Sequence, residues 1–174
     1  MSLSDRRRFL TLLAAAGASV GGLAACGFTP AYAPQGGATR LVNRMQIEAP
    51  QDGDAYDVVT HLESLFGRSG NPDYFLQITL RVDEERMAIT DSNIATRINV
   101  TGAAMFTLTA VATGDVITSG EVSSFTGYSA TGSTVATQSA AMDARERLMT
   151  ILADRIATRL YAIAPDLPAD PSAV

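Results

Sequence analysis

The chain has 174 residues, a formal net charge of −5 and a single cysteine. This length suits one domain that can bury a core of useful size. From Cys26 onward the chain holds ten arginines, seventeen acidic residues and no lysine, a formal net charge of −7. Composition therefore excludes nucleic acid as an expected partner, because proteins that bind it present cations to the phosphates.

An export signal is predicted in residues 1–25. Three arginines, Arg6 to Arg8, precede an apolar stretch from Phe9 to Val20, which small residues follow. The apolar stretch is shorter than the roughly 20 residues that a membrane-spanning helix needs, so we interpret it as a cleaved signal peptide. The segment from Asp5 to Thr11 resembles a twin-arginine signal, but its arginine run fits a basic Sec signal as well.

The end of this signal predicts a lipid anchor. Leu23-Ala24-Ala25-Cys26 has the form of a lipobox, in which the cysteine becomes the lipid-modified first residue of the mature chain. The alternative is that Cys26 is merely a small residue near a cleavage site, but it is the only cysteine and would otherwise be an unexplained thiol in an exported protein. We expect no cofactor except the covalent diacylglycerol and N-acyl chain on Cys26. Gly27 follows in place of Asp, which by resemblance to bacterial sorting rules predicts the periplasmic face of the outer membrane.

The mature chain divides into three segments. Residues 26–38 contain two prolines and a glycine pair, which is typical of an extended tether, here a lipidated one. Residues 165–174 contain three prolines and two aspartates, which favours a disordered tail. We therefore expect a single α+β domain over residues 39–164.

The first half of this domain is predicted to hold a strand and a helix. Residues alternate from Leu41 to Ile47, which favours a strand that ends before Pro50. Asp52-Gly53-Asp54 offers capping residues, and apolar residues then recur at helical spacing as far as Gly67. His61 is expected on the exposed side of this helix as a surface residue, since no other metal ligand lies at ligand spacing.

Three strands are expected next. Polar and apolar residues alternate from Tyr74 to Val82, and the pattern resumes from Met87 to Ile89. Asp91 to Asn93 offers a turn, and further strands are predicted from Ile94 to about Ala112 and from Val116 to about Tyr128. Short turns between them predict an antiparallel meander.

A long helix is predicted from Gln138 to Ala162, because Leu148, Leu152, Ile156 and Leu160 form one stripe. The order is therefore strand, helix, three strands, helix. This order predicts an α+β fold, a four-stranded and mainly antiparallel sheet with two helices packed on one face.

Catalysis is not expected. The chain has one histidine and no Gly-x-Ser-x-Gly motif, so a hydrolase triad has no visible framework. The carboxylates of Asp83, Glu84 and Glu85 are consecutive on a predicted strand and point to opposite faces, which disfavours a cation site. We therefore predict no catalytic residue and no metal ligand.

The mature sequence resembles a known family. Its opening, Cys26-Gly27-Phe28-Thr29-Pro30-Ala31-Tyr32, looks like the Cys-Gly-Phe-x-Pro-x-Tyr start of the lipopolysaccharide-assembly lipoprotein family (LptE) of alphaproteobacteria. The stretch from Tyr128 to Leu160 is similar to the strand and long helix that end that family. The resemblance implies a non-enzymatic plug and assembly partner of the outer-membrane β-barrel LptD, which helps to deliver lipopolysaccharide to the outer leaflet.

Direct contact with lipopolysaccharide needs cations for the lipid phosphates. The mature chain has no lysine, so we assign this contact, as a hypothesis, to Arg86 and Arg97, which flank the predicted hairpin turn. The alternative is that both are ordinary solvated arginines. Unchanged lipopolysaccharide binding and outer-membrane permeability after loss of both side chains would contradict the hypothesis.

A second function stays open at this point. A lipid-anchored auxiliary subunit of a periplasmic phospholipid or solute transport system could use a similar small α+β domain as a docking module. Fold does not separate the two functions, because unrelated functions share such scaffolds. The identity of the partner protein, a β-barrel or a transporter component, distinguishes the two functions.

Overall fold

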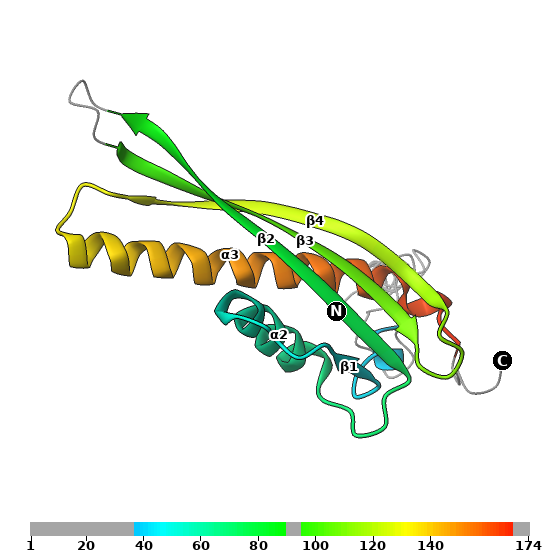
Figure 1. The fold of residues 1–174 in the computed structure, drawn as a ribbon. Coiled ribbons are helices and arrows are strands. Elements are labelled where there is room, and N and C mark those ends of the chain that lie inside the picture. Colours follow the sequence, from blue (N-terminus) through cyan, green and yellow to red (C-terminus); the bar gives the residue numbers. More distant parts are fainter. Residues whose placement is uncertain (1–36, 90–94, 169–174) are drawn as a thin grey trace, which may run out of the picture.

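The computed structural model describes residues 37–89 and 95–168, which form a four-stranded sheet and two long helices (Figure 1). The α+β class and the order of strand, helix, three strands and helix are confirmed. The elements in chain order are η2 (Gly37–Arg40), β1 (Met45–Ile47), α2 (Gly53–Phe66), β2 (Tyr74–Ile89), β3 (Ala95–Ala110), β4 (Val116–Ser129), α3 (Thr134–Ile163) and η3 (Ala164–Asp166).

The sheet has the strand order β1-β2-β3-β4. Strands β2, β3 and β4 form the predicted antiparallel meander, in which Leu80 pairs with Ala104 and Ala104 with Val122. A bulge interrupts the β2–β3 ladder next to Arg86. The predicted turn at residues 91–93 lies outside the described residues. Both long strands of the hairpin continue beyond α2 (Figure 1).

Strand β1 is shorter than the sequence predicts. The alternating stretch from Leu41 to Ile47 becomes a strand only at Met45, where β1 pairs in parallel with the start of β2. The preceding residues form a turn, and Asn43 has a φ of 58°, a conformation that Asn tolerates better than most residues. The Asn43 N–H donates to the Phe66 carbonyl at 2.6 Å, so the turn is fixed by the end of α2.

Helix α2 begins and ends at the residues that the sequence indicates. The Asp52 side chain accepts a hydrogen bond from the Ala55 N–H at 2.8 Å, which satisfies one free donor of the first turn. Gly67 ends the helix with a φ of 74° and donates to the Glu63 carbonyl. A Cβ at Gly67 would lie 2.0 Å from the Asn43 Oδ1 atom, so both the backbone conformation and the space require glycine.

Helix α3 is longer than predicted, because it begins at Thr134 with Ser133 as its N-cap. The predicted apolar stripe is confirmed, and all four of its residues are fully buried: Leu148, Leu152, Ile156 and Leu160. The helix lies close to the sheet at Gly102, where an added Cβ would be 3.0 Å from a Leu148 methyl carbon. A glycine at this point of β3 therefore permits the close approach of α3.

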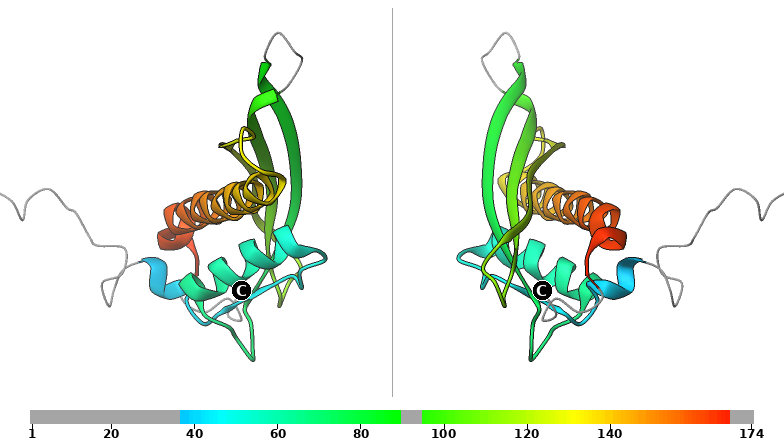
Figure 2. Two further views of the ribbon diagram at one scale, coloured as in Figure 1. Left: turned by 90° about the vertical axis from the view of Figure 1, so that its left-hand side faces the viewer. Right: turned by 90° about the vertical axis from the view of Figure 1, so that its right-hand side faces the viewer.

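The core lies between the sheet and the helices (Figure 2). The strands contribute fully buried residues, among them Leu76, Val100 and Leu108, and α2 contributes Leu62 and Phe66. Complete burial of each such side chain is worth about 1.5–3 kcal/mol relative to leaving it exposed. Because these buried side chains of the strands and of both helices form one core, the helices cover one face of the sheet, which we call the inner face.

The two ends of the described chain meet at the β1 end of the molecule. The Arg40 guanidinium donates to the Pro165 carbonyl at 2.7 Å and to the Leu167 carbonyl, and Leu167 is buried. The folded part therefore continues past Ala164, where we expected it to end. Within residues 37–89 and 95–168, no helix combines the length and the apolar character needed to cross a membrane.

Candidate functional site

The face of the sheet opposite the helices, which we call the outer face, is not covered by any helix of residues 37–89 and 95–168 (Figure 2). Strand alternation places polar, charged and small residues there, with two large apolar ones among them. In paired rows they are Gln77, Thr107 and Ser119; Thr79, Met105 and Glu121; Arg81, Ala103 and Ser123; and Asp83, Thr101 and Phe125. Two large apolar side chains are open to solvent in this setting, Phe125 at 68% and Met105 at 54% exposure. The outer face is thus a broad polar surface that includes exposed apolar side chains, a composition suited to binding another protein.

A charged cluster lies on the inner face where the helices and the sheet meet. The Arg145 Nε of α3 donates to both carboxylate oxygens of Asp54 at 3.0 Å, and its Nη1 donates to Glu84 Oε1 at 3.3 Å. The Tyr128 hydroxyl of β4 donates to Glu84 Oε2 at 3.4 Å. One arginine therefore connects the first turn of α2 with β2 and, through Glu84, with β4.

Tyr128 is held as a donor in this cluster. Burial, the negative charge of Glu84 and the hydrogen bond to it raise the pKa of Tyr128 above its ordinary value. A tyrosine hydroxyl is already protonated at neutral pH, and the raised pKa lets Tyr128 remain a donor to Glu84 to a higher pH than an ordinary tyrosine. Arg145 lies outside the apolar stripe of α3, and the sequence does not reveal its partners, because Asp54 and Glu84 come from distant segments.

Replacement of Arg145 by methionine is expected to lower the free energy of unfolding by about 1–2 kcal/mol, because it removes two partly exposed ion pairs and leaves two carboxylates facing an apolar group. The matched control is Arg147→Met, which removes one exposed pair with Asp143 and should cost about 0.3–0.5 kcal/mol. Urea unfolding followed by circular dichroism measures both. Equal losses would mean that the cluster has no special structural role.

The hypothesised lipid-phosphate ligands, Arg86 and Arg97, both lie exposed near the far end of the β2–β3 hairpin. Strand alternation places Arg86 on the inner face with Glu84 and places Arg97 on the outer face with Asn99. They therefore do not form one two-arginine site, and each would meet an anion on its own face of the sheet.

The consecutive carboxylates also separate as predicted. The Asp83 carboxylate lies on the outer face, 3.3 Å from the Arg81 Nε, whereas Glu84 lies on the inner face with Arg145.

His61 is partly exposed and its Nε2 is 2.8 Å from Asp154 Oδ1, a contact that joins α2 to α3. Across the part of the chain that the structure describes, no group of three His, Cys, Asp or Glu side chains could hold a metal ion. Cys26 lies outside the described residues.

Solved structures share this arrangement of helices and strands. A candidate lipoprotein from Caulobacter crescentus superimposes with a TM-score of 0.60 and 22% identity, over 75% of this chain and 97% of that chain. The chain has the fold of bacterial lipoproteins. Rare lipoprotein B from Shewanella oneidensis matches with a TM-score of 0.56 and 10% identity, over 70% of this chain and 95% of that one. Lipoprotein B from Nitrosomonas europaea matches with a TM-score of 0.55 and 11% identity, over 70% and 84%.

No protein-family model and no curated protein matches the sequence. The solved structures are only 10–22% identical to this chain in sequence, so their similarity shows a shared fold. These structures agree with the lipoprotein class that the lipobox predicts.

Proposed function

We propose that this protein is a lipid-anchored lipoprotein of the outer membrane that binds an LptD-type β-barrel as its plug and assembly partner. In this complex it takes part in the transport of lipopolysaccharide and its insertion into the outer leaflet. The lipoprotein fold and the opening sequence from Cys26 to Tyr32 both support the proposal. The function is one of binding and needs no catalytic group.

The outer face is the observation that carries the proposal. The lumen of a large outer-membrane barrel is polar, so a plug must offer hydrogen-bonding groups over a broad area. Threonine and serine hydroxyls both donate and accept hydrogen bonds. On the outer face they recur along β3 and β4, and β2 adds Thr79 together with the polar side chain of Gln77. Phe125 and Met105 supply apolar contacts of the type that dominate the energy of protein interfaces.

The double variant Phe125→Glu with Met105→Glu is expected to reduce recovery of the barrel at least about tenfold, because it adds two charges to the centre of the proposed interface. Recovery is measured as the ratio of barrel to tagged protein after purification in mild detergent. Both residues are exposed, so the fold should be unaffected. The control is Val135→Glu on α3, where the side chain is 74% exposed and away from the outer face.

Unchanged recovery with the double variant would remove the outer face from the proposal. Recovery of components of a phospholipid or solute transporter, with no barrel, would favour the auxiliary-subunit function instead.

A further inference from the structure

Strand β2 leaves much of one edge open. Strand β1 pairs with it only from Tyr74 to Leu76, and the last hydrogen bond on this side runs from the Glu48 N–H to the Leu76 carbonyl at 2.9 Å. Because backbone groups alternate along a strand, those of Ile78, Leu80 and the later even-numbered residues face the same side. Within the described residues, no backbone hydrogen bond reaches Ile78 or Leu80 from this side.

The chain itself turns away from the open edge. After β1, the segment from Glu48 to Asp52 arches toward the start of α2, and Pro50 within it has no N–H to donate. A hollow of about 200 Å³ remains between this arch and β2. Its apolar lining includes Val58, Val59, Ile78 and Leu80. The hollow therefore combines free backbone groups of a strand with space for an apolar side chain.

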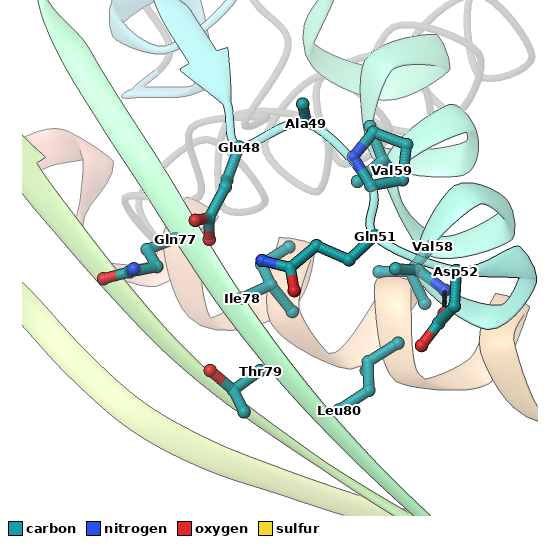
Figure 3. A pocket seen from close by; sticks show the side chains of 12 residues that line it. Glu48, Ala49, Gln51, Asp52, Val58, Val59, Gln77, Ile78, Thr79 and Leu80 are labelled. Atoms are coloured by element: carbon teal, nitrogen blue, oxygen red, sulfur yellow. Dashed lines mark hydrogen bonds between the residues drawn. The ribbon is translucent and has the colours of Figure 1, made fainter.

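The rim of the hollow is acidic. Figure 3 shows the Glu48 carboxylate and the Gln51 amide pointing into the space between the arch and β2. Glu48 and Asp52 are the only charged residues in its lining, and Asp52 caps α2. Among residues 37–89 and 95–168, no ion pair involves Glu48. A ligand that brings a cation beside Glu48 would meet an uncompensated negative charge.

The remainder of the mature chain does not provide that cation. Residues 26–36, 90–94 and 169–174, which lie outside the described residues, contain no arginine or lysine. A second copy is also disfavoured, since the mature chain carries a net negative charge. The charge of the hollow therefore points to a different protein.

We propose that the open edge of β2, from Ile78 to Glu84, receives an extended segment of a partner protein as an added strand. The segment places an arginine or lysine beside Glu48 and an apolar side chain over Val58 and Ile78. Backbone hydrogen bonds to the edge give affinity, and the hollow and Glu48 give specificity. This site is separate from the outer face, so it goes beyond the proposed function and does not require that the partner be a barrel.

The test uses the full-length protein in the membranes of its own cells, with a photo-crosslinking amino acid at Gln51. Cross-linked products are digested, and mass spectrometry identifies the captured segment. We expect one defined segment with alternating apolar residues and an arginine or lysine. A photo-crosslinker at Ser119, on the far strand β4, should not capture this segment.

Charge reversal shows whether Glu48 selects the segment. Glu48→Arg is expected to lower the cross-linking yield at Gln51 about tenfold, because two like charges then meet in a narrow space. Glu48→Gln should give an intermediate loss, and Glu146→Arg, at an exposed position of α3, should give none. Circular dichroism verifies that each variant is folded.

An acidic captured segment, a yield that Glu48→Arg does not change, or capture at Ser119 and not at Gln51 would each overturn the proposal. If the captured segment fits but comes from a protein that is not a β-barrel, the strand-addition site stands, and recovery of a barrel through the outer face decides the proposed function separately.

Discussion

Replacement of Cys26 by alanine is expected to move the protein from the membrane fraction almost entirely to the soluble periplasmic fraction. The lipobox cysteine is the only residue on which the lipid anchor is predicted. Several acyl chains on one residue make binding stable, whereas a single chain binds only marginally. Fractionation followed by immunoblotting measures the shift.

A matched variant outside the lipobox, Phe28→Ala, should remain in the membrane fraction. Mass spectrometry of the N-terminal peptide supplies the direct readout, because the mature wild-type chain should begin at Cys26 with its acyl mass. A wild-type chain that retains residues 1–25 and carries no acyl group would contradict the lipoprotein assignment.

The variant Leu152→Ala is expected to lower the free energy of unfolding by about 2–5 kcal/mol. Leu152 is fully buried in the middle of α3, and one of its methyl carbons lies 3.1 Å from the position of a Cβ added to Gly102. Truncation therefore leaves a cavity where the helix meets the sheet. Because domains are typically stable by about 5–15 kcal/mol, this loss is a large fraction of the total.

The control for this variant is Met142→Ala, on the same helix but 67% exposed, which should change stability by less than about 0.5 kcal/mol. Urea unfolding measures both variants, and the slope with urea should be unchanged. A loss for Leu152→Ala no larger than that of the control would mean that α3 does not pack on the sheet as described.

Local patterns were sufficient to predict the main elements. Asp52 and Gly67 predict the ends of α2 because capping depends on residues that are close in sequence. The alternation of polar and apolar residues from Tyr74 to Val82 predicts β2, and the apolar stripe that includes Leu152 predicts α3. Both predictions succeed because the two-residue period of a strand and the 3.6-residue period of a helix each continue over the length of the element.

Features that depend on distant residues were not predicted. The stretch from Leu41 to Arg44 alternates like a strand, but contact with the end of α2 holds it in a turn. Arg145 looks like a solvated helix residue until the fold brings Asp54 and Glu84 to it. The open edge of β2 depends on where β1 stops pairing, which the pattern of β1 does not reveal.

The faces of Arg86 and Arg97 illustrate the same point at the candidate site. Their positions near one hairpin turn suggested a shared role in binding phosphate. Their faces depend on strand register, which places them on opposite sides of the sheet. Their contact with lipopolysaccharide stays a prediction, with one arginine available on each face.

The central claim concerns the partner, and purification of the tagged wild-type protein from outer membranes in mild detergent tests it most directly. Mass spectrometry identifies the proteins recovered and their stoichiometry. The account predicts a large β-barrel of the LptD type in a fixed ratio to the lipoprotein. Recovery of transporter components, or of no partner, from membranes that contain the barrel would contradict it.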